Sequence, residues 1–341
     1  MADALDPDIA FAAVRITEQA AIEAARHTGR GDERTADGAA IDAACAGLAD
    51  FPAQGKIVVG EGLAGSADRL FIGEGVGQSG GSPVHIAVDP LEGATTTARG
   101  GPNALSILAV GCEGGLVRMP DIYMEKIAVG PGLPEGVIDL DRAPGENLAA
   151  VAAARGVGVG ELVVCILDRP RHADLVTKVR EAGARIALIQ DGDVSGIVAT
   201  AVPAAGTDLY MGIGGAPEGV LAAAALRSTG GQMRARLVLR TDEDRAKALE
   251  CGHEDFKRIF SAADLAPGDV IFAATGVTQG MILKGVRRVA AGVHTQSLIV
   301  CSGTSTVRWL DTYHDGHQGA VGRDAADPDS GPGPVGRAAQ P

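Results

Sequence analysis

The sequence is poor in aromatic residues and has no long hydrophobic run. Aromatic side chains make up 3% of its 341 residues, so a core must consist mainly of Ala, Val, Ile and Leu. No apolar run approaches the ~18 residues that a bilayer span needs. The opening residues, MADALDPDIA, have no basic segment leading into an apolar one, as a secretory signal would have. We therefore expect no membrane span, no membrane partner and a cytoplasmic location.

Basic residues are also scarce, with 30 Lys and Arg against 43 Asp and Glu and a net charge of −13. Contact with a nucleic-acid backbone needs clustered Lys and Arg, so no nucleic-acid partner is expected. An excess of carboxylates instead suits a protein that holds cations. The five cysteines are widely spread with no CxxC pair, which favours inert buried thiols over disulfides.

The chain divides by pattern near residue 145, as its length of roughly two domains allows. A helix is predicted from Asp6-Pro7 to before Gly29, where Ile9, Ala13 and Ile16 recur at helical spacing. A second helix at 38–49 follows, and then strands at 56–59, 69–72, 84–88, 104–110 and 126–129. Residues 1–145 should therefore form a sheet flanked by two helices.

Beyond residue 145, helices and strands alternate. Helices are predicted at 146–155, 171–182, 217–227 and 242–251, and strands at 162–167, 185–189, 208–211, 270–274 and 296–301. Strict alternation indicates βαβ crossovers and a largely parallel sheet over 146–313. Residues 314–341 are rich in Gly, Pro and Asp without apolar periodicity, which predicts a disordered tail.

Acidic residues in the first half of the chain stand at the ends of predicted elements. Asp32 lies between the two helices, Glu61 follows a strand, and Asp89 and Glu92 lie in the turn VDPLEG. Two carboxylates three residues apart at a strand end can share one concave patch, and oxygen ligands suit Mg²⁺ or Mn²⁺. Each acid alone could cap a helix or fill a turn, but the set together favours a metal site.

Three loops of the second half follow consecutive strands, at 167–172, 189–194 and 211–220. Ligands of open α/β sheets bind at the carboxyl ends of the strands, so these loops should face one crevice. Arg169 and Arg171 can fork onto phosphate oxygens, and Glu218 could ligate a metal. His172 could be a general base but is more typical of a polar residue that starts a helix. Tyr123 is either a core residue or a sugar-contacting hydroxyl.

Eight motifs together carry a resemblance. In chain order over residues 8–313 they are GRGDxxTADGAA, VxGEG, VDPLEG, DIYMEKIAVGPG, DRPRH, DGDV, GIGGAPEGV and ATGVT. This set resembles the class II fructose-1,6-bisphosphatases of the lithium-sensitive sugar phosphatase superfamily. The resemblance implies an α/β fold, a layered αβαβα sandwich, in a homo-oligomer (dimer or tetramer). It also implies hydrolysis of the 1-phosphate of fructose 1,6-bisphosphate with Mn²⁺ or Mg²⁺, in gluconeogenesis or Calvin-type carbon metabolism.

Carried over by motif, the resemblance assigns roles to individual residues. It makes residues 1–145 the metal-binding half and 146–313 the half that binds the sugar and the distal phosphate. The implied metal ligands are Asp32, Glu61, Asp89, Glu92 and Glu218, and the implied catalytic residues are Glu61, Asp89, Glu92 and Thr95. The implied substrate contacts are Glu92, Gly93, Ala94, Tyr123, Arg169, Pro170, Arg171, Asp191, Gly192, Asp193 and Gly215.

One position departs from the family pattern. The turn normally continues with a Thr whose hydroxyl is thought to orient or activate the attacking water, and here Ala94 stands in its place, followed by Thr95. Either Thr95 reaches in, or the site works without the hydroxyl, or turnover is impaired. Ala94 leaves open a catalytically silent sugar-phosphate-binding protein. A dual fructose-1,6-/sedoheptulose-1,7-bisphosphatase also stays open, since a sugar one carbon longer changes only the distal contacts, as does, on the weak GIGG signal, a dinucleotide-dependent oxidoreductase.

Overall fold

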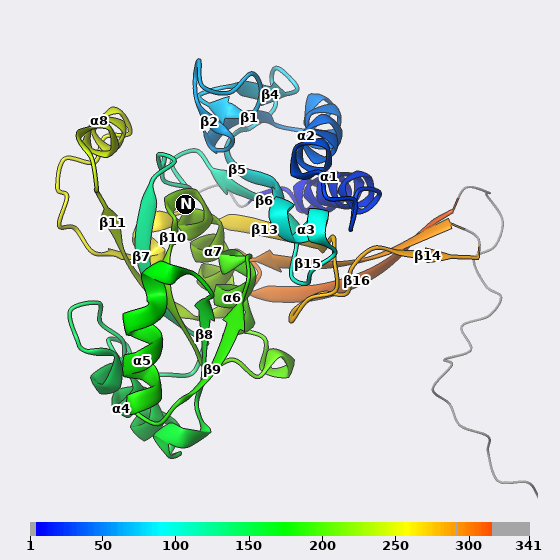
Figure 1. Ribbon diagram of the computed structural model, residues 1–341. Helices are drawn as coiled ribbons and strands as arrows, with labels where there is room; N and C mark the ends of the chain where they lie inside the picture. The colour runs from blue at the N-terminus through cyan, green and yellow to red at the C-terminus, as the bar shows by residue number, and fades with distance from the viewer. Residues whose placement is uncertain (1–4, 291, 316–341) are drawn as a thin grey trace, which may run out of the picture.

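The computed structural model describes residues 5–290 and 292–315. Its elements form five layers, in the order helices, sheet, helices, sheet, helices (Figure 1). Helices α1 (Pro7–Ala25) and α2 (Glu33–Ala49) cover the outer face of the first sheet. Helices α4 (Pro144–Arg155) and α5 (Ala173–Glu181) cover the outer face of the second sheet. The predicted layered α/β sandwich is confirmed.

The first sheet has the strand order β14-β15-β13-β6-β5-β1-β4, with β16 on the other side of β15. Only β1 and β5 run parallel within it. Its strands are β1 (Gln54–Val59), β4 (Gly75–Gly77), β5 (Pro83–Glu92), β6 (Leu105–Cys112), β13 (Val270–Gly276), β14 (Arg287–Val289), β15 (Gly292–Cys301) and β16 (Thr306–Asp315). The predicted strand at 69–72 shrinks to β3 (Phe71–Ile72), which pairs with β2 (Gly62–Leu63).

The second sheet is mixed, so the prediction of a largely parallel sheet is wrong in part. Its order is β12-β11-β7-β10-β8-β9, and only β9, β8 and β10 run parallel. Strand β7 enters antiparallel between β10 and β11 and breaks the βαβ pattern. The strands are β7 (Tyr123–Val129), β8 (Val163–Leu167), β9 (Arg185–Ile189), β10 (Leu209–Gly215), β11 (Gln232–Val238) and β12 (Phe260–Ser261).

Sheet membership crosses the boundary expected at residue 145. Strand β7 comes from the first half of the chain but lies in the second sheet, whereas β13 to β16 return to the first sheet. Strand β16, which was not predicted, runs to Asp315 and so includes the expected start of the tail. It forms a long hairpin with β15 that projects from the body (Figure 1). Residues 316–341, the rest of that tail, lie outside the described residues.

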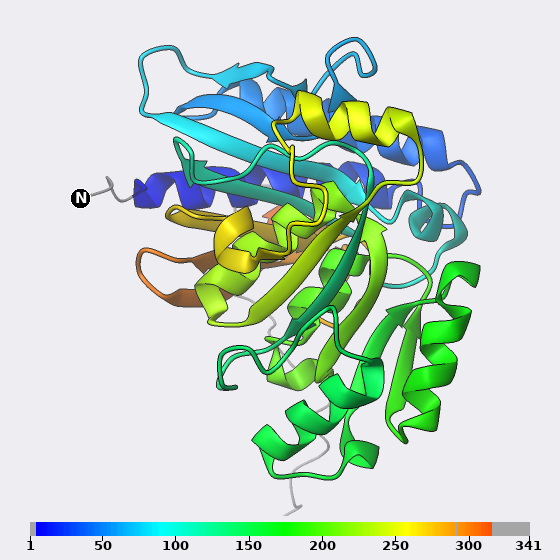
Figure 2. The ribbon, with the colours of Figure 1, turned by 90° about the vertical axis from the view of Figure 1, so that its left-hand side faces the viewer.

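The middle helical layer is shared by both sheets (Figure 2). It contains α6 (Asp193–Ala199), α7 (Ala216–Thr229) and α9 (Ala262–Leu265). Ala222 to Ala225 of α7 are at most 1% exposed. A helix with methyl side chains on all sides lets two sheets approach it closely, and the three form one continuous core.

Helix starts follow the capping residues. Asp6 Oδ1 accepts the N–H of Asp8 at 2.9 Å, and Pro7 occupies the first turn of α1, as predicted. Helix α2 starts at Glu33, five residues before the predicted start, because Asp32 caps it. The short helices α3 (Ala94–Arg99), η1 (Val159–Glu161), η2 (Pro170–His172) and η3 (Pro203–Ala205), with α8 (Asp242–Glu250), complete the described elements. None of the helices described is both long enough and apolar enough to cross a membrane.

Candidate active site

A cavity of about 330 Å³ lies between the two sheets, at the ends of β5, β8 and β10. Residues from the loops after β8, β9 and β10 line it together with the end of β5. The turn predicted at Asp89–Glu92 is wrong, because β5 continues to Glu92 with a register shift in its pairing with β6. The predicted site residues in its wall are Asp89, Glu92, Gly93, Tyr123, Arg169, Arg171, Asp191, Asp193, Gly215 and Glu218, joined by Leu91, Leu167 and Gly214. Within the described chain, the wall does not include Asp32, Glu61, Ala94, Thr95, Pro170 or Gly192.

One wall of the cavity is acidic. Glu92, 5% exposed at the end of β5, accepts the N–H of Val194 through Oε1 at 2.7 Å. Among the described residues, Oε2 of Glu92 and Oε2 of Glu218 are buried without a hydrogen-bond partner. A buried carboxylate oxygen without a donor is costly in a folded protein. A bound cation or hydrogen-bond donor at these two oxygens would therefore stabilise the site.

The pKa values of this wall show the same deficit of positive charge. Burial raises the pKa of Asp89 and of Glu92 well above the ordinary range, and neighbouring carboxylates add to both shifts. Burial also raises the pKa of Glu218 to about 7, with the Asp193 charge as the next cause. Desolvation by the surrounding protein raises the pKa of Glu61 to about 7, and the charges of Asp37 and Asp121 add smaller upward shifts. A divalent cation would relieve this mutual repulsion.

The acids are not gathered as a ligand cluster. In the part of the chain that the structure describes, no group of three or more His, Cys, Asp or Glu side chains is placed to hold a metal ion. The donor chemistry fits Mg²⁺ or Mn²⁺, because hard carboxylate oxygens are present and two of them are unpartnered. Binding would therefore need these side chains to turn toward a common centre.

Asp32 and Asp37 differ in what their carboxylates contact. Asp32 caps α2 and accepts the Thr35 N–H at 3.0 Å, and the Thr35 hydroxyl bond lowers its pKa. Asp37, five residues later, is partly buried, and its charge raises the pKa of both Glu61 and Asp89. Asp37 thus shares the electrostatic environment of the acidic wall. Asp37 is not among the residues predicted for the site, because the helix is predicted to begin only at residue 38.

Two glycines make room for carboxylates. A Cβ on Gly214 would lie 1.9 Å from Oδ2 of Asp193, and a Cβ on Gly215 would lie 1.9 Å from Oε2 of Glu218. Any side chain at either position would displace the acid. The GIGG run therefore serves close packing of carboxylates against backbone at the start of α7, not a dinucleotide turn.

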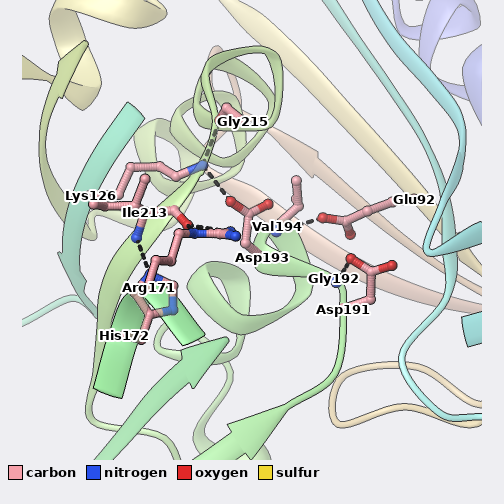
Figure 3. Close-up of polar contacts among 10 residues, drawn as sticks. All are labelled: Glu92, Lys126, Arg171, His172, Asp191, Gly192, Asp193, Val194, Ile213 and Gly215. Carbon is pink, nitrogen blue, oxygen red and sulfur yellow. Dashed lines mark hydrogen bonds and ion pairs between the residues drawn. The ribbon is translucent and has the colours of Figure 1, made fainter. Parts of the chain in front are cut away.

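Lys126 is the buried cation of the site (Figure 3). Its ammonium group donates to Oδ2 of Asp193 and, at 2.6 Å, to the carbonyl oxygen of Gly215. It thereby joins β7 to the first residue of α6 and to the residue before α7. The sequence carried a signal for this: Lys126 shares one face of β7 with the apolar Met124 and Ala128, both of which are buried.

The opposite wall is basic. Arg171 donates from Nε and Nη2 to the carbonyl oxygen of Ile213 at 2.9 and 2.7 Å, and its guanidinium carbon lies 5.0 Å from the ring centre of Tyr123. Arg169 Nη2 lies 3.6 Å from Oδ1 of Asp191. These guanidinium groups keep free N–H donors toward the cavity that they line.

His172 is structural. It is 2% exposed, and its Nε2 accepts the N–H of Ile213 at 2.8 Å. Nδ1 must therefore carry the proton, which it donates to the carbonyl oxygen of Leu167 at 2.7 Å. The ring ties β8 to β10 beneath Arg171, in keeping with its interpretation as a polar residue at a helix start.

Ala94 and Thr95 begin α3. Gly93, with φ of 95°, precedes them and lines the cavity. The hydroxyl of Thr95 donates to Oε2 of Glu33 on α2 at 2.9 Å. That hydroxyl is therefore engaged between two helices.

Comparison with known proteins shows the family of the chain. The family model described as "Bacterial fructose-1,6-bisphosphatase, glpX-encoded" matches residues 7–314. The chain belongs to the class 2 fructose-1,6-bisphosphatase family. It is 41% identical to "Fructose-1,6-bisphosphatase 1 class 2" of Escherichia coli K12, over 90% of this chain and 95% of that protein. It is 39% identical to "D-fructose 1,6-bisphosphatase class 2/sedoheptulose 1,7-bisphosphatase" of Synechococcus sp. JA-3-3Ab, over 92% and 98%.

Replacing Lys126 by Met should destabilise the fold strongly, because it leaves the Asp193 carboxylate buried without its cation. Breaking such a pair costs about 3–5 kcal/mol. Lys178→Met is the matched control: Lys178 pairs with Asp174 on the exposed surface of α5, and such pairs contribute about 0.5 kcal/mol. Urea unfolding followed by circular dichroism measures both. Equal, small losses for the two variants would contradict a structural role for Lys126.

Stability should fall with acidity in a way that depends on His172. Burial lowers the pKa of His172 below its ordinary value, so the unfolded chain takes up a proton near pH 6.5 that the folded protein does not. The contribution of the neutral ring is complete above about pH 6.5 and is lost as the pH falls toward the folded pKa. The excess stability of wild type over His172→Gln should shrink from pH 7.5 to pH 5. A gap that stays constant in urea unfolding would refute this.

Proposed function

We propose that this chain is a metal-dependent phosphatase that hydrolyses the 1-phosphate of fructose 1,6-bisphosphate to fructose 6-phosphate and phosphate. The observation that carries the proposal is the polarity of the cavity: unpartnered carboxylates on one wall face guanidinium groups on the other. A substrate with a phosphate at each end and hydroxyls between fits that polarity, and family membership supports it.

Mg²⁺ or Mn²⁺ would be held by Asp89, Glu92, Glu218 and Glu61. When bound, such an ion neutralises phosphoryl oxygens and stabilises the leaving oxygen. Asp32, implied as a ligand by the resemblance, would have to release Thr35 to take part. Asp37 is proposed to support the metal site, because its charge raises the pKa of Glu61 and of Asp89.

The other wall holds the sugar and the distal phosphate. Arg169 and Arg171 offer guanidinium donors to phosphate oxygens, and Tyr123 presents a half-exposed ring and hydroxyl beside them. Asp191, which lines the cavity, would accept sugar hydroxyls. Asp193 is committed through Oδ2 to Lys126, so it serves chiefly to position the loop.

Family membership also supports the finer proposals: a cytoplasmic enzyme of carbon metabolism, in gluconeogenesis or a Calvin-type cycle, assembled as a homo-oligomer. A dual fructose-1,6-/sedoheptulose-1,7-bisphosphatase is a second candidate, because the Synechococcus relative carries both activities in its name. Ala94 favours a third, a binding protein with little turnover.

Phosphate release from fructose 1,6-bisphosphate should require Mn²⁺ or Mg²⁺ and stop when EDTA is added. Glu92→Gln should lower the rate at least ~100-fold, because it removes charge that the cation needs. Sedoheptulose 1,7-bisphosphate, assayed in parallel, separates the single from the dual enzyme. No release from either substrate, with fructose 6-phosphate still raising the melting temperature, would favour the silent binding protein.

Ala94→Thr should raise turnover, since a missing positioning group typically costs ~10²–10⁴ in rate. Thr95→Val should change the rate little, because the Thr95 hydroxyl is bonded to Glu33. Both variants are assayed for kcat with saturating metal. Loss of activity in Thr95→Val together with no gain in Ala94→Thr would instead show that Thr95 supplies the catalytic hydroxyl.

A further inference from the structure

We propose that Arg240, which lies over the cavity-lining Tyr123, is a third guanidinium group of this site, which binds the distal phosphate and selects sugar bisphosphates over monophosphates. The inference rests on the proposed function for its substrate. It concerns a residue outside every sequence motif identified above, on the segment between β11 and α8.

The pairing of β7 with β11 brings the segment that holds Arg240 close to Tyr123. Tyr123, at the start of β7, pairs with Gly215 at the end of β10 on one side and with Val238 at the end of β11 on the other. Arg240 stands two residues beyond Val238, the last residue of β11. Arg240 is therefore beside Tyr123, which lines the cavity.

The backbone at Arg240 is held in place. Oδ2 of Asp244 accepts the N–H of Arg240 at 2.8 Å and the N–H of Thr241 at 3.0 Å. The Thr241 hydroxyl in turn accepts the N–H of Asp244 at 3.1 Å, which completes a capping box at the start of α8. Arg240 thus extends from a fixed point and not from a loose loop.

Its guanidinium group lies over the ring of Tyr123, with the central carbon 4.3 Å from the ring centre. Arg171 approaches the same ring at 5.0 Å. Two guanidinium groups against one ring repel each other, and the ring face compensates only part of that cost. A single anion bound by both guanidinium groups would offset the repulsion.

Neither arginine is neutralised by protein. Across the residues that the structure describes, no carboxylate lies within 4.0 Å of the Arg240 or Arg171 guanidinium nitrogens, whereas Arg236, on the same strand, is paired with Glu125 at 3.0 Å and Asp141 at 2.7 Å. Guanidinium forks match phosphate oxygens in geometry. The opposite wall is acidic, so a phosphate without bound metal is attracted only to the Tyr123 end.

The test compares two substrates in variants of one residue. Arg240→Ala should raise KM for fructose 1,6-bisphosphate about tenfold and leave kcat nearly unchanged, since the lost contact is a charge-assisted hydrogen bond far from the scissile phosphate. Its kcat/KM for fructose 1-phosphate, which lacks the distal group, should match wild type. Arg240→Lys should recover part of the affinity. Arg245→Ala is the matched control, because Arg245 lies on exposed α8 and pairs with Asp242.

A binding measurement separates this inference from the proposed function. Calorimetric titration with fructose 6-phosphate in EDTA should show about tenfold weaker binding in Arg240→Ala than in wild type. That result without any phosphate release would refute the phosphatase and keep the role of Arg240. The inference is overturned if wild type does not bind fructose 6-phosphate, if Arg240→Ala changes neither KM nor this affinity, or if it impairs both substrates equally.

Discussion

The buried ion pair between Lys126 and Asp193 connects the parts on which the site depends. Lys126 belongs to the second sheet, and Asp193 is the first residue of α6 in the middle layer. The next residue, Val194, donates its N–H to Glu92 of the first sheet. This short path fixes the acidic end of the cavity relative to the basic end. Lys126 also opposes the rise in the pKa of Glu218, so one cation serves both position and charge.

The charge distribution of the cavity is uneven by construction. Lys126 balances Asp193, which leaves Asp89, Glu92 and Glu218 to share a buried space with no cation of their own among the described residues. At the other end, Arg171 and Arg240 share one aromatic ring with no carboxylate close by in the same described part. Bound divalent cations at the acidic end and an anionic group at the basic end would balance the charge at both ends of the cavity.

Local sequence patterns predicted most helices and strands, because helix caps and apolar periodicity act over a few residues. The layered order and most of the residues that line the cavity were implied by the family resemblance instead. Long-range pairing was not predictable in this way. The local sequence of β7 is the same whether its neighbours run parallel or antiparallel, and β16 forms through its pairing with β15. Asp32 and Asp37 belong to one motif, and the residue at which α2 starts decides which of the two carboxylates caps the helix. Arg240 lies outside any motif, and its position over Tyr123 depends on the pairing of β7 with β11.

The alanine-rich α7 limits how the molecule can move. Both sheets press against this one helix, and a single apolar core extends from one sheet through it to the other. A hinge motion that separates the two sheets would split that core and expose it to water, at a free-energy cost comparable to that of unfolding. Substrate must therefore enter and leave while the framework stays rigid, through rearrangement of side chains and loops at the rim.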